Sequence, residues 1–314
     1  MSFRSMRNAI ASMIVIVAAF TSCPAAALAG EGAECASISS QGINRQMNLE
    51  ASEILVNCGV MPAGSATGGS ASSPAAPGTS FPGSDVNVIT GTETYPHVTQ
   101  SESFVWSHGS TIVVSYNDSR GVTASPANLS GLSVSHDGGA TFTRLGPSSP
   151  LTGHVKNRGD PIVVYNEKLG KWFAGDLVAE EGTGSCGAKG IGLWTSTEGD
   201  TWTVGACAHV GSNDDRESMW VDNNPSSPFY GRMYISYNNF SVGGGALEVT
   251  HSDNGTTWTA PVVLFSSFRR NVQLTGSPGS DGTVFVVGQN ENGGGVGNTG
   301  QQNYIYRSTD GGVT

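Results

Sequence analysis

Three arginine residues stand at similar places in a repeating sequence, and together they could bind a carboxylate. A turn recurs along the chain with an aspartate, or the residue in its place, at positions 137, 197, 253 and 310. Arg158, Arg216 and Arg270 precede the last three of these positions by 39, 37 and 40 residues, and His97 precedes the first by 40. If the repeats fold alike, these side chains approach one another. Planar guanidinium groups pair with a carboxylate through two parallel hydrogen bonds. The competing interpretation is that each arginine pairs with a nearby acid or faces solvent, as surface arginines commonly do.

The recurring turn is the strongest pattern in the sequence. It reads SHDGGATF at 135–142, TSTEGDTW at 195–202, HSDNGTTW at 251–258 and STDGGVT at 308–314. The aspartate positions, or those in their place, are 60, 56 and 57 residues apart. Glycine supplies positive φ, and short polar side chains hydrogen-bond the backbone, so we predict a structural turn. A calcium loop does not fit, because no copy offers a spaced series of oxygen ligands. The structural residues are Asp137, Gly139, Thr141, Thr197, Gly199, Trp202, Asp253, Gly255, Trp258, Asp310 and Gly312.

Short β-rich runs surround each turn. A strand-like run ends at the turn in every repeat, at 132–135, 192–195, 247–250 and 304–307. Earlier runs at 111–116, 171–175, 232–237 and 283–287 predict second strands, and runs at 161–165 and 218–221 predict first strands. With a fourth strand after the turn, each repeat fits one blade of an all-β propeller with four-stranded blades.

The turn Ser-x-Asp-x-Gly-x-Thr-Trp resembles the Asp-box, or BNR repeat, of the sialidase superfamily over residues 87–314. The copies depart from it with Phe142 as the first aromatic, Thr195 and Thr197 in the second, and His251 in the serine position of the third. The resemblance implies a sialidase-like propeller whose boxes lie between the last two strands of each blade, remote from the active site. That type has six blades, so the four repeats here would be a truncated propeller.

The resemblance also implies catalytic residue types. A retaining sialidase uses a tyrosine nucleophile, a glutamate and an acid/base aspartate. By type, the tyrosines available are Tyr95, Tyr165, Tyr237 and Tyr304, and the acid/base candidates are Asp160 and Glu217. The Arg-Ile-Pro motif of the family is absent, and Tyr95-Pro96-His97 occupies the comparable region.

Two functions therefore remain open. The first is a non-catalytic module that binds a carbohydrate or an extracellular protein. The second is an exo-sialidase-type glycoside hydrolase whose arginine cluster grips a substrate carboxylate. Neither requires a cofactor. His97 and His154 lack a spaced partner, so we predict no metal site.

The start of the chain has the features of a secretory leader. Arg4 and Arg7 precede an apolar run, and small residues before Gly30 suit cleavage after residue 29. A lipid anchor at Cys23 is a weaker alternative. Export to the periplasm or outside the cell permits disulfides, and proximity favours the pairs Cys35–Cys58 and Cys186–Cys207.

Composition divides the rest of the chain and excludes some partners. Residues 30–61 predict a small helical segment, residues 62–86 are a linker rich in Gly, Ser, Pro and Ala, and residues 87–314 hold the repeats. The formal net charge of −10 argues against nucleic acid as a partner. No transmembrane span is expected once the leader is removed.

Overall fold

The computed structural model describes residues 33–40, 42–45, 49–60, 86–89, 97, 99–146, 151–179, 186–277, 279, 281–290 and 302–314. The expected leader, Cys23, nearly all of the linker and Tyr95 lie outside the described residues. Among the described residues, no helix is long and apolar enough to cross a membrane.

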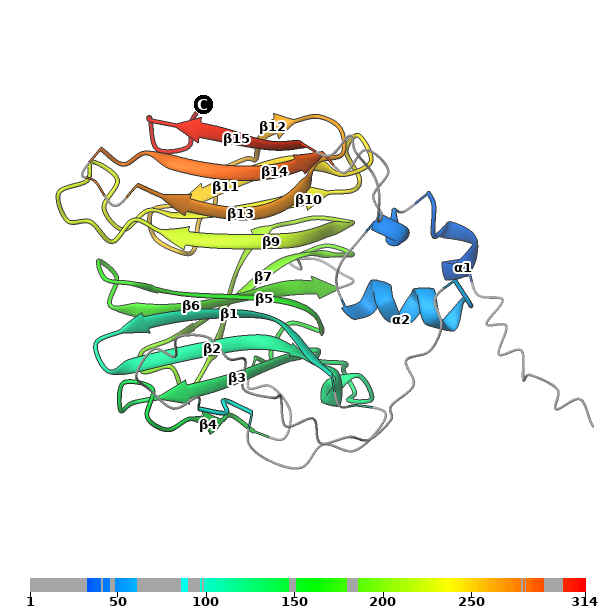
Figure 1. The fold of residues 1–314 in the computed structure, drawn as a ribbon, viewed down its shortest axis with the longest axis horizontal. Coiled ribbons are helices and arrows are strands. Elements are labelled where there is room, and N and C mark those ends of the chain that lie inside the picture. Colours follow the sequence, from blue (N-terminus) through cyan, green and yellow to red (C-terminus); the bar gives the residue numbers. More distant parts are fainter. Residues whose placement is uncertain are drawn as a thin grey trace, which may run out of the picture.

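Four antiparallel sheets make up the propeller (Figure 1). Blade 1 contains β1 (Gln100–His108), β2 (Thr111–Asp118), β3 (Ser130–Ser135) and β4 (Thr143–Arg144). Blade 2 contains β5 (Lys156–Asn166), β6 (Lys171–Ala179), β7 (Gly190–Ser196) and β8 (Thr203–His209). Blade 3 contains β9 (Asp214–Val221), β10 (Met233–Asn239), β11 (Ala246–Ser252) and β12 (Val262–Phe265). Blade 4 contains β13 (Arg270–Gly276), β14 (Val284–Asn290) and β15 (Gln302–Ser308).

The sheets confirm an all-β propeller of four blades. Strand order follows the chain within every sheet, and the first strands of consecutive blades contact one another. The predicted second and third strands coincide with β2, β6, β10 and β14 and with β3, β7, β11 and β15. The first strands β5 and β9 begin earlier than predicted, at Lys156 and Asp214, because their polar N-terminal residues lack the apolar pattern of a buried strand.

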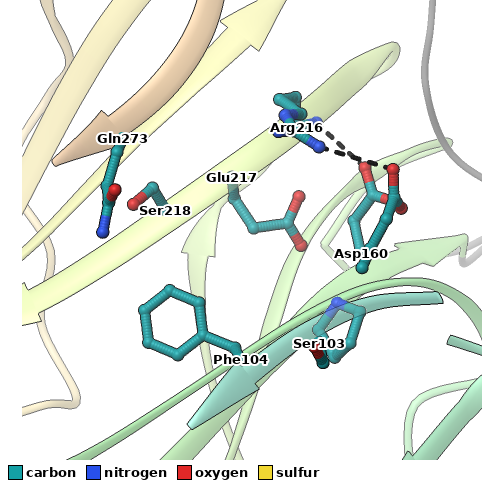
Figure 2. Close-up of a pocket in the computed structure, with 9 residues that line it drawn as sticks. Ser103, Phe104, Asp160, Arg216, Glu217, Ser218 and Gln273 are labelled. Carbon is teal, nitrogen blue, oxygen red and sulfur yellow. Dashed lines mark hydrogen bonds and ion pairs between the residues drawn. The ribbon is translucent and has the colours of Figure 1, made fainter. Parts of the chain in front are cut away.

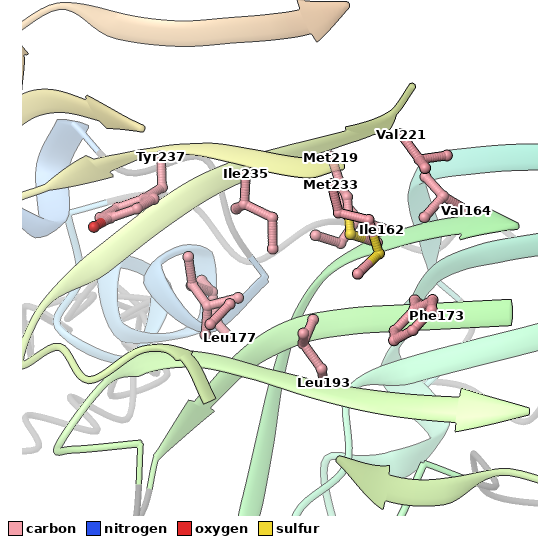
Figure 3. Close-up of a cluster of buried hydrophobic side chains, with 12 residues drawn as sticks. Ile162, Val164, Phe173, Leu177, Leu193, Met219, Val221, Met233, Ile235 and Tyr237 are labelled. Atoms are coloured by element: carbon pink, nitrogen blue, oxygen red, sulfur yellow. The ribbon is translucent and has the colours of Figure 1, made fainter. Parts of the chain in front are cut away.

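The core lies between blades rather than within a single blade. Figure 3 shows the cluster between blades 2 and 3, where Ile162, Phe173 and Leu193 meet Met219 and Ile235. A second cluster joins blades 1 and 2, and a third joins blades 3 and 4. Each blade therefore depends on its neighbour to bury its apolar face.

In blades 1 to 3 the recurring turn joins the third and fourth strands, as predicted, and its side chains hydrogen-bond the backbone. In blade 1, Ser135 Oγ accepts from Gly139 N at 2.9 Å, and Asp137 accepts from the N–H and hydroxyl of Thr141 at 2.9 and 2.6 Å. These bonds hold the pKa of Asp137 well below its usual value. The turn after β15 repeats the same bonds with Ser308, Asp310, Gly312 and Thr314.

The turn of blade 2 differs from the expected alignment by one residue. Ser196, not Thr195, is the serine whose Oγ accepts from Gly199 N, at 2.8 Å. The glycine follows the serine by three residues here and by four in blade 1, so the turn is one residue shorter. Thr197 is exposed, while Trp202 is buried and donates to Gly199 O at 2.9 Å.

The turn of blade 3 shows the same shortening. Ser252, not His251, accepts from Gly255 N at 2.9 Å, and Asn254 Oδ1 accepts from the N–H groups of Thr256 and Thr257. Asp253 therefore does not lock the turn. Its carboxylate instead pairs with Arg232, at 2.7 and 2.9 Å.

A small helical segment, described at 33–40, 42–45 and 49–60, lies beside the stacked sheets, at the right-hand side of Figure 1. It contains α1 (Ala33–Ser37), the 3₁₀ helix η1 (Ile43–Arg45) and α2 (Leu49–Asn57), and α2 contacts β5. Both predicted disulfides are confirmed: Cys35–Cys58 joins this segment's ends, and Cys186–Cys207 lies within blade 2.

Candidate functional site

The first strand of each blade is interrupted by a β-bulge at the same position. The pairing register shifts after Ser101 in β1, between Gly159 and Ile162 in β5, opposite Ser236–Asn238 in β9, and after Asn271 in β13. In blades 1 to 3 the bulged residue has a left-handed backbone: φ is 51° at Glu102, 58° at Asp160 and 57° at Arg216. Such φ values are strained for residues other than glycine and often occur at functional sites.

The bulges bring side chains from the first strands of all four blades to one cavity of about 220 Å³ (Figure 2). It is lined by Glu102, Ser103, Phe104, Asp160, Pro161, Arg216, Glu217, Ser218 and Gln273. We call it the channel cavity. Ser103 on β1 and Gln273 on β13 are exposed, whereas Asp160 on β5 and Glu217 on β9 are buried.

Glu217 is the least satisfied polar group of the cavity. Its side chain points into the cavity in Figure 2, and only 8% of the residue is exposed. Neither carboxylate oxygen has a hydrogen-bond partner among the described residues. Burial, reinforced by the nearby Asp160 carboxylate, raises the pKa of Glu217 well above its usual value. Glu217 can therefore hold a proton at a pH where an exposed glutamate is ionised.

Asp160 and Glu102 form a second acidic group beside an arginine. Burial raises the pKa of Asp160 well above its usual value; the neighbouring Glu102 carboxylate adds to this effect, and Arg216 opposes it. The backbone N–H of Arg216 donates to Asp160 Oδ2 at 3.2 Å, and its Nη1 lies 3.4 Å from Glu102 Oε1. The guanidinium is therefore already engaged with an acid from another blade.

Two buried asparagines hold the bulges in place. Asn117 on β2 donates to Glu102 Oε2 at 2.6 Å and accepts from Asp160 N at 2.8 Å. The side-chain amide of Asn271 on β13 donates to Arg216 O at 2.6 Å, and the backbone carbonyl of Asn271 accepts from Arg216 Nε at 3.4 Å. These bonds link neighbouring blades across the positions where the backbone is strained, so they fix the direction of the acidic side chains.

The structure brings three of the predicted residues together and places two others outside the lining. Asp160, Glu217 and Arg216 all line the channel cavity. Arg158 and Arg270 are not among its lining residues, because the pairing registers align them with Asp214, two residues before the bulge. The sequence already carried a sign of this difference in position: Arg216 precedes its turn by 37 residues, whereas Arg158 and Arg270 precede theirs by 39 and 40.

The tyrosines and histidines considered from sequence lie elsewhere. Tyr165 stacks on His108 with ring centroids 3.7 Å apart, Tyr237 is buried against His209, and Tyr304 packs near Arg269. None of the three lines the channel cavity. His154 packs edge-on against Trp194 at 4.8 Å, and His97 precedes β1.

Sequence reasoning missed Glu102, Gln273 and Asn117. A usable signal existed for the first of these. Glu102, Asp160 and Arg216 follow one another at 58 and 56 residues, close to the repeat length. No cluster of three or more His, Cys, Asp or Glu side chains among the described residues could hold a metal ion.

The side chains of the channel cavity include groups of the kind used in acid–base chemistry. It holds a buried acid in Glu217, a pair of carboxylates in Asp160 and Glu102, and one engaged cation in Arg216. Two carboxyl groups in different environments are the usual equipment for hydrolysis of a glycosidic bond.

Comparison with solved structures agrees on the fold. The α-L-arabinanase of Penicillium chrysogenum matches with a TM-score of 0.50 and 14% identity, over 68% of this chain and 65% of that one. An α-L-arabinofuranosidase of Fusarium graminearum matches with a TM-score of 0.49 and 13% identity, over 68% of this chain and 63% of that one. The exo-β-1,3-galactanase of Phanerochaete chrysosporium matches at 0.44 and 16%, over 72% and 51%.

This chain therefore spans just under two thirds of the length of the first two structures. At such identities the likeness shows the propeller fold alone. These neighbours are propeller glycosidases and not sialidases, so the comparison does not support the finer resemblance to sialidases. No protein-family model and no curated protein matches the sequence.

Proposed function

We propose that this chain is a glycoside hydrolase that binds an uncharged sugar in the channel cavity and uses Glu217 as its general acid. The observation that carries the proposal is the state of Glu217: it is buried, points into the cavity, and has no partner for either oxygen among the described residues. A structural carboxylate would be expected to find hydrogen bonds or a cation. A general acid, in contrast, needs a raised pKa and a free direction toward the leaving group.

The second acidic group supplies the complementary role. As the glycosidic C–O bond breaks, Glu217 gives its proton to the leaving oxygen. Water adds to the anomeric carbon and gives its proton to the Asp160–Glu102 pair, which restores the charge balance of the site. Asn117 and Arg216 orient this pair through the bonds already described.

The lining of the cavity suits a neutral sugar better than an acidic one, because it offers no unpaired cation among the described residues. Its lining holds the three carboxyl groups of Glu102, Asp160 and Glu217, and the one cation in the lining, Arg216, already pairs with Glu102. An anionic ligand would have to displace that pair and approach the remaining acids. Phe104 adds an apolar surface to the lining, which suits the C–H face of a sugar ring.

A panel of fluorogenic glycosides tests the proposal. The panel contains methylumbelliferyl α-L-arabinofuranoside, β-D-galactoside and α-sialoside, because arabinosides and galactosides are named for the similar structures. We expect turnover of a neutral glycoside and none of the sialoside. Glu217→Gln should lower kcat by about 10²–10⁴-fold.

Glu198→Gln provides the matched control, because Glu198 is an exposed glutamate on the turn after β7. It should leave kcat unchanged. Turnover that survives Glu217→Gln would overturn the assigned role. Binding of a neutral sugar without turnover of any glycoside would instead support the non-catalytic carbohydrate-binding module.

A further inference from the structure

Asp176 on β6 is a buried carboxyl group that the proposed reaction does not use. It is 0% exposed and is not among the residues that line the channel cavity. In the pairing of β5 with β6 it stands opposite the two bulged residues, Asp160 and Pro161. Its oxygens are hydrogen-bonded by Ser130 of blade 1 and by Asn157 at the start of β5. Asp176 therefore links blade 1 to the bulge that carries Asp160.

The side-chain amide of Asn157 has a fixed orientation. Its Oδ1 accepts from the backbone N–H of Gly159 at 2.9 Å, and its Nδ2 donates to Asp176 Oδ2 at 2.9 Å. A flipped amide would place its NH₂ group against the N–H of Gly159, and two donors cannot bond each other. Asn157 Oδ1 is therefore an acceptor, and any group that hydrogen-bonds it must supply the proton.

Ser130 lies between two oxygens that would both need a donor if Asp176 were ionised. Its Oγ is 2.9 Å from Asn157 Oδ1 and 2.5 Å from Asp176 Oδ1. A hydroxyl group has one proton, so it can donate to only one of them. An ionised Asp176 would leave the other contact as two oxygens without a proton between them. With a proton on Asp176 Oδ1, that group donates to Ser130 Oγ, Ser130 donates to Asn157 Oδ1, and every contact is a hydrogen bond.

The surroundings of Asp176 also favour its neutral form. Burial raises the pKa of Asp176 well above its usual value; the hydrogen bonds from Ser130 and Asn157 oppose this rise, and the nearby Asp160 carboxylate adds to it. In the described part of the chain, no cation is among the groups that shift this pKa. An ionised carboxylate without a cation is costly in a protein interior, so such a group tends to keep its proton.

We infer that Asp176 is a positioning residue that stays protonated in the folded protein and, through Asn157, holds the bulge that directs Asp160 into the channel cavity. The ring of bonds through Ser130 keeps Asn157 Oδ1 aimed at the N–H of Gly159, where the backbone turns left-handed, with φ 88° at Gly159 and 58° at Asp160. A neutral group does this without adding a negative charge beside Asp160. The role in catalysis rests on the proposed function, because it assumes that Asp160 takes part in the reaction.

Infrared difference spectroscopy at pH 7, with wild type compared with Asp176→Asn, tests the protonation state. Protonated carboxyl groups and carboxylates absorb at different frequencies, so the two forms are told apart directly. We expect the variant to lose a protonated-carboxyl band and no carboxylate band. Asp137→Asn is the matched control, since Asp137 is exposed and its pKa lies well below the usual value, so that variant should lose carboxylate bands alone. Loss of carboxylate bands in Asp176→Asn would overturn the inference.

Amide exchange and kinetics test the positioning. Asp176→Leu removes both hydrogen bonds, whereas the amide of Asp176→Asn can donate to Ser130 and accept from Asn157 in the same places. We expect faster exchange over residues 157–165 in the leucine variant than in the asparagine variant. On a glycoside that the wild type hydrolyses, Asp176→Leu should lower kcat by about 10²-fold with little change in KM, because Asp160 is displaced. Asp176→Asn should restore most of that loss.

Ser130→Ala breaks the same ring with a smaller change, so it replaces Asp176→Leu if the leucine variant does not fold. It should also speed exchange over residues 157–165. Equal exchange, or an equal loss of kcat, in Asp176→Asn and Asp176→Leu would overturn the positioning role. The infrared and exchange measurements do not depend on turnover. A protein that hydrolyses no glycoside would therefore refute the proposed function, while these two measurements would still decide whether Asp176 is neutral and holds the bulge.

Discussion

Replacing Glu217 by glutamine should change how the stability of the protein depends on pH. In the folded chain Glu217 is 8% exposed, with neither carboxylate oxygen hydrogen-bonded among the described residues, and its pKa lies well above the usual value of 4.5. In the unfolded chain the same group is solvated and ionises near that usual value. Between the two pKa values, the folded state therefore holds one more proton than the unfolded state.

The sign and size follow from proton linkage. Because the folded state binds the extra proton, each pH unit gained within this window costs the wild-type protein up to about 1.4 kcal/mol of unfolding free energy. The contribution is fully present below the unfolded pKa and is lost as pH rises to the folded one. Glu217→Gln cannot ionise, so the variant should gain stability over the wild type by that amount per unit.

Urea unfolding at half-unit steps from pH 4.5 to 8, with the disulfides intact, measures the difference. The variant and wild type should be within about 1 kcal/mol of each other at the lowest pH, as expected for near-isosteric neutral side chains. Glu198→Gln, an exposed replacement, should show a flat difference across the range. A difference between Glu217→Gln and wild type that does not grow with pH would show that Glu217 is ionised when folded, and would refute the reasoning.

Two further perturbations test how the site and the helical segment are held. Asn117→Ala leaves Glu102 Oε2 and the N–H of Asp160 without their partner, so it should cost about 1–3 kcal/mol for each group in urea unfolding; no loss would show that water replaces the amide. Gly42→Ala should raise amide exchange across residues 33–60 more than Gly59→Ala, because both glycines have positive φ but only a Cβ on Gly42 meets the propeller, 2.4 Å from Phe240; equal exchange in the two variants would contradict this contact.

Much of the scaffold could be predicted because it depends on local chemistry. The turn residues repeat at nearly constant intervals, and glycine and short polar side chains close such turns through bonds to their own backbone. The repeat therefore predicted the blades and their second and third strands. The expected export of the chain and the proximity of the cysteines in the sequence predicted both disulfides. Asp253 was misassigned because two successive polar residues, Asp253 and Asn254, can both serve as acceptors, and a shortened turn selects the second.

The site itself depended on contacts between distant parts of the chain. Asp160 and Glu217 were candidates by residue type, but Glu102 was not, because nothing local marks it. Its role comes from a bulge in β1 and from Asn117, which binds both Glu102 and the backbone of Asp160 in the next blade. Likewise, the pairing registers place Arg216 at the bulge, and Arg158 and Arg270 two residues before the bulges of their own strands.

By itself, then, the sequence determined the repeat, the turns that close it and the all-β blades, because short-range hydrogen bonds and strand periodicity are written in neighbouring residues. Tertiary structure decided which polar side chains share the channel cavity and how far the pKa of Glu217 departs from that of a solvated glutamate. A left-handed bulge shifts a side chain by one register position, and burial between blades raises a pKa, and both effects exist only once four blades are packed together.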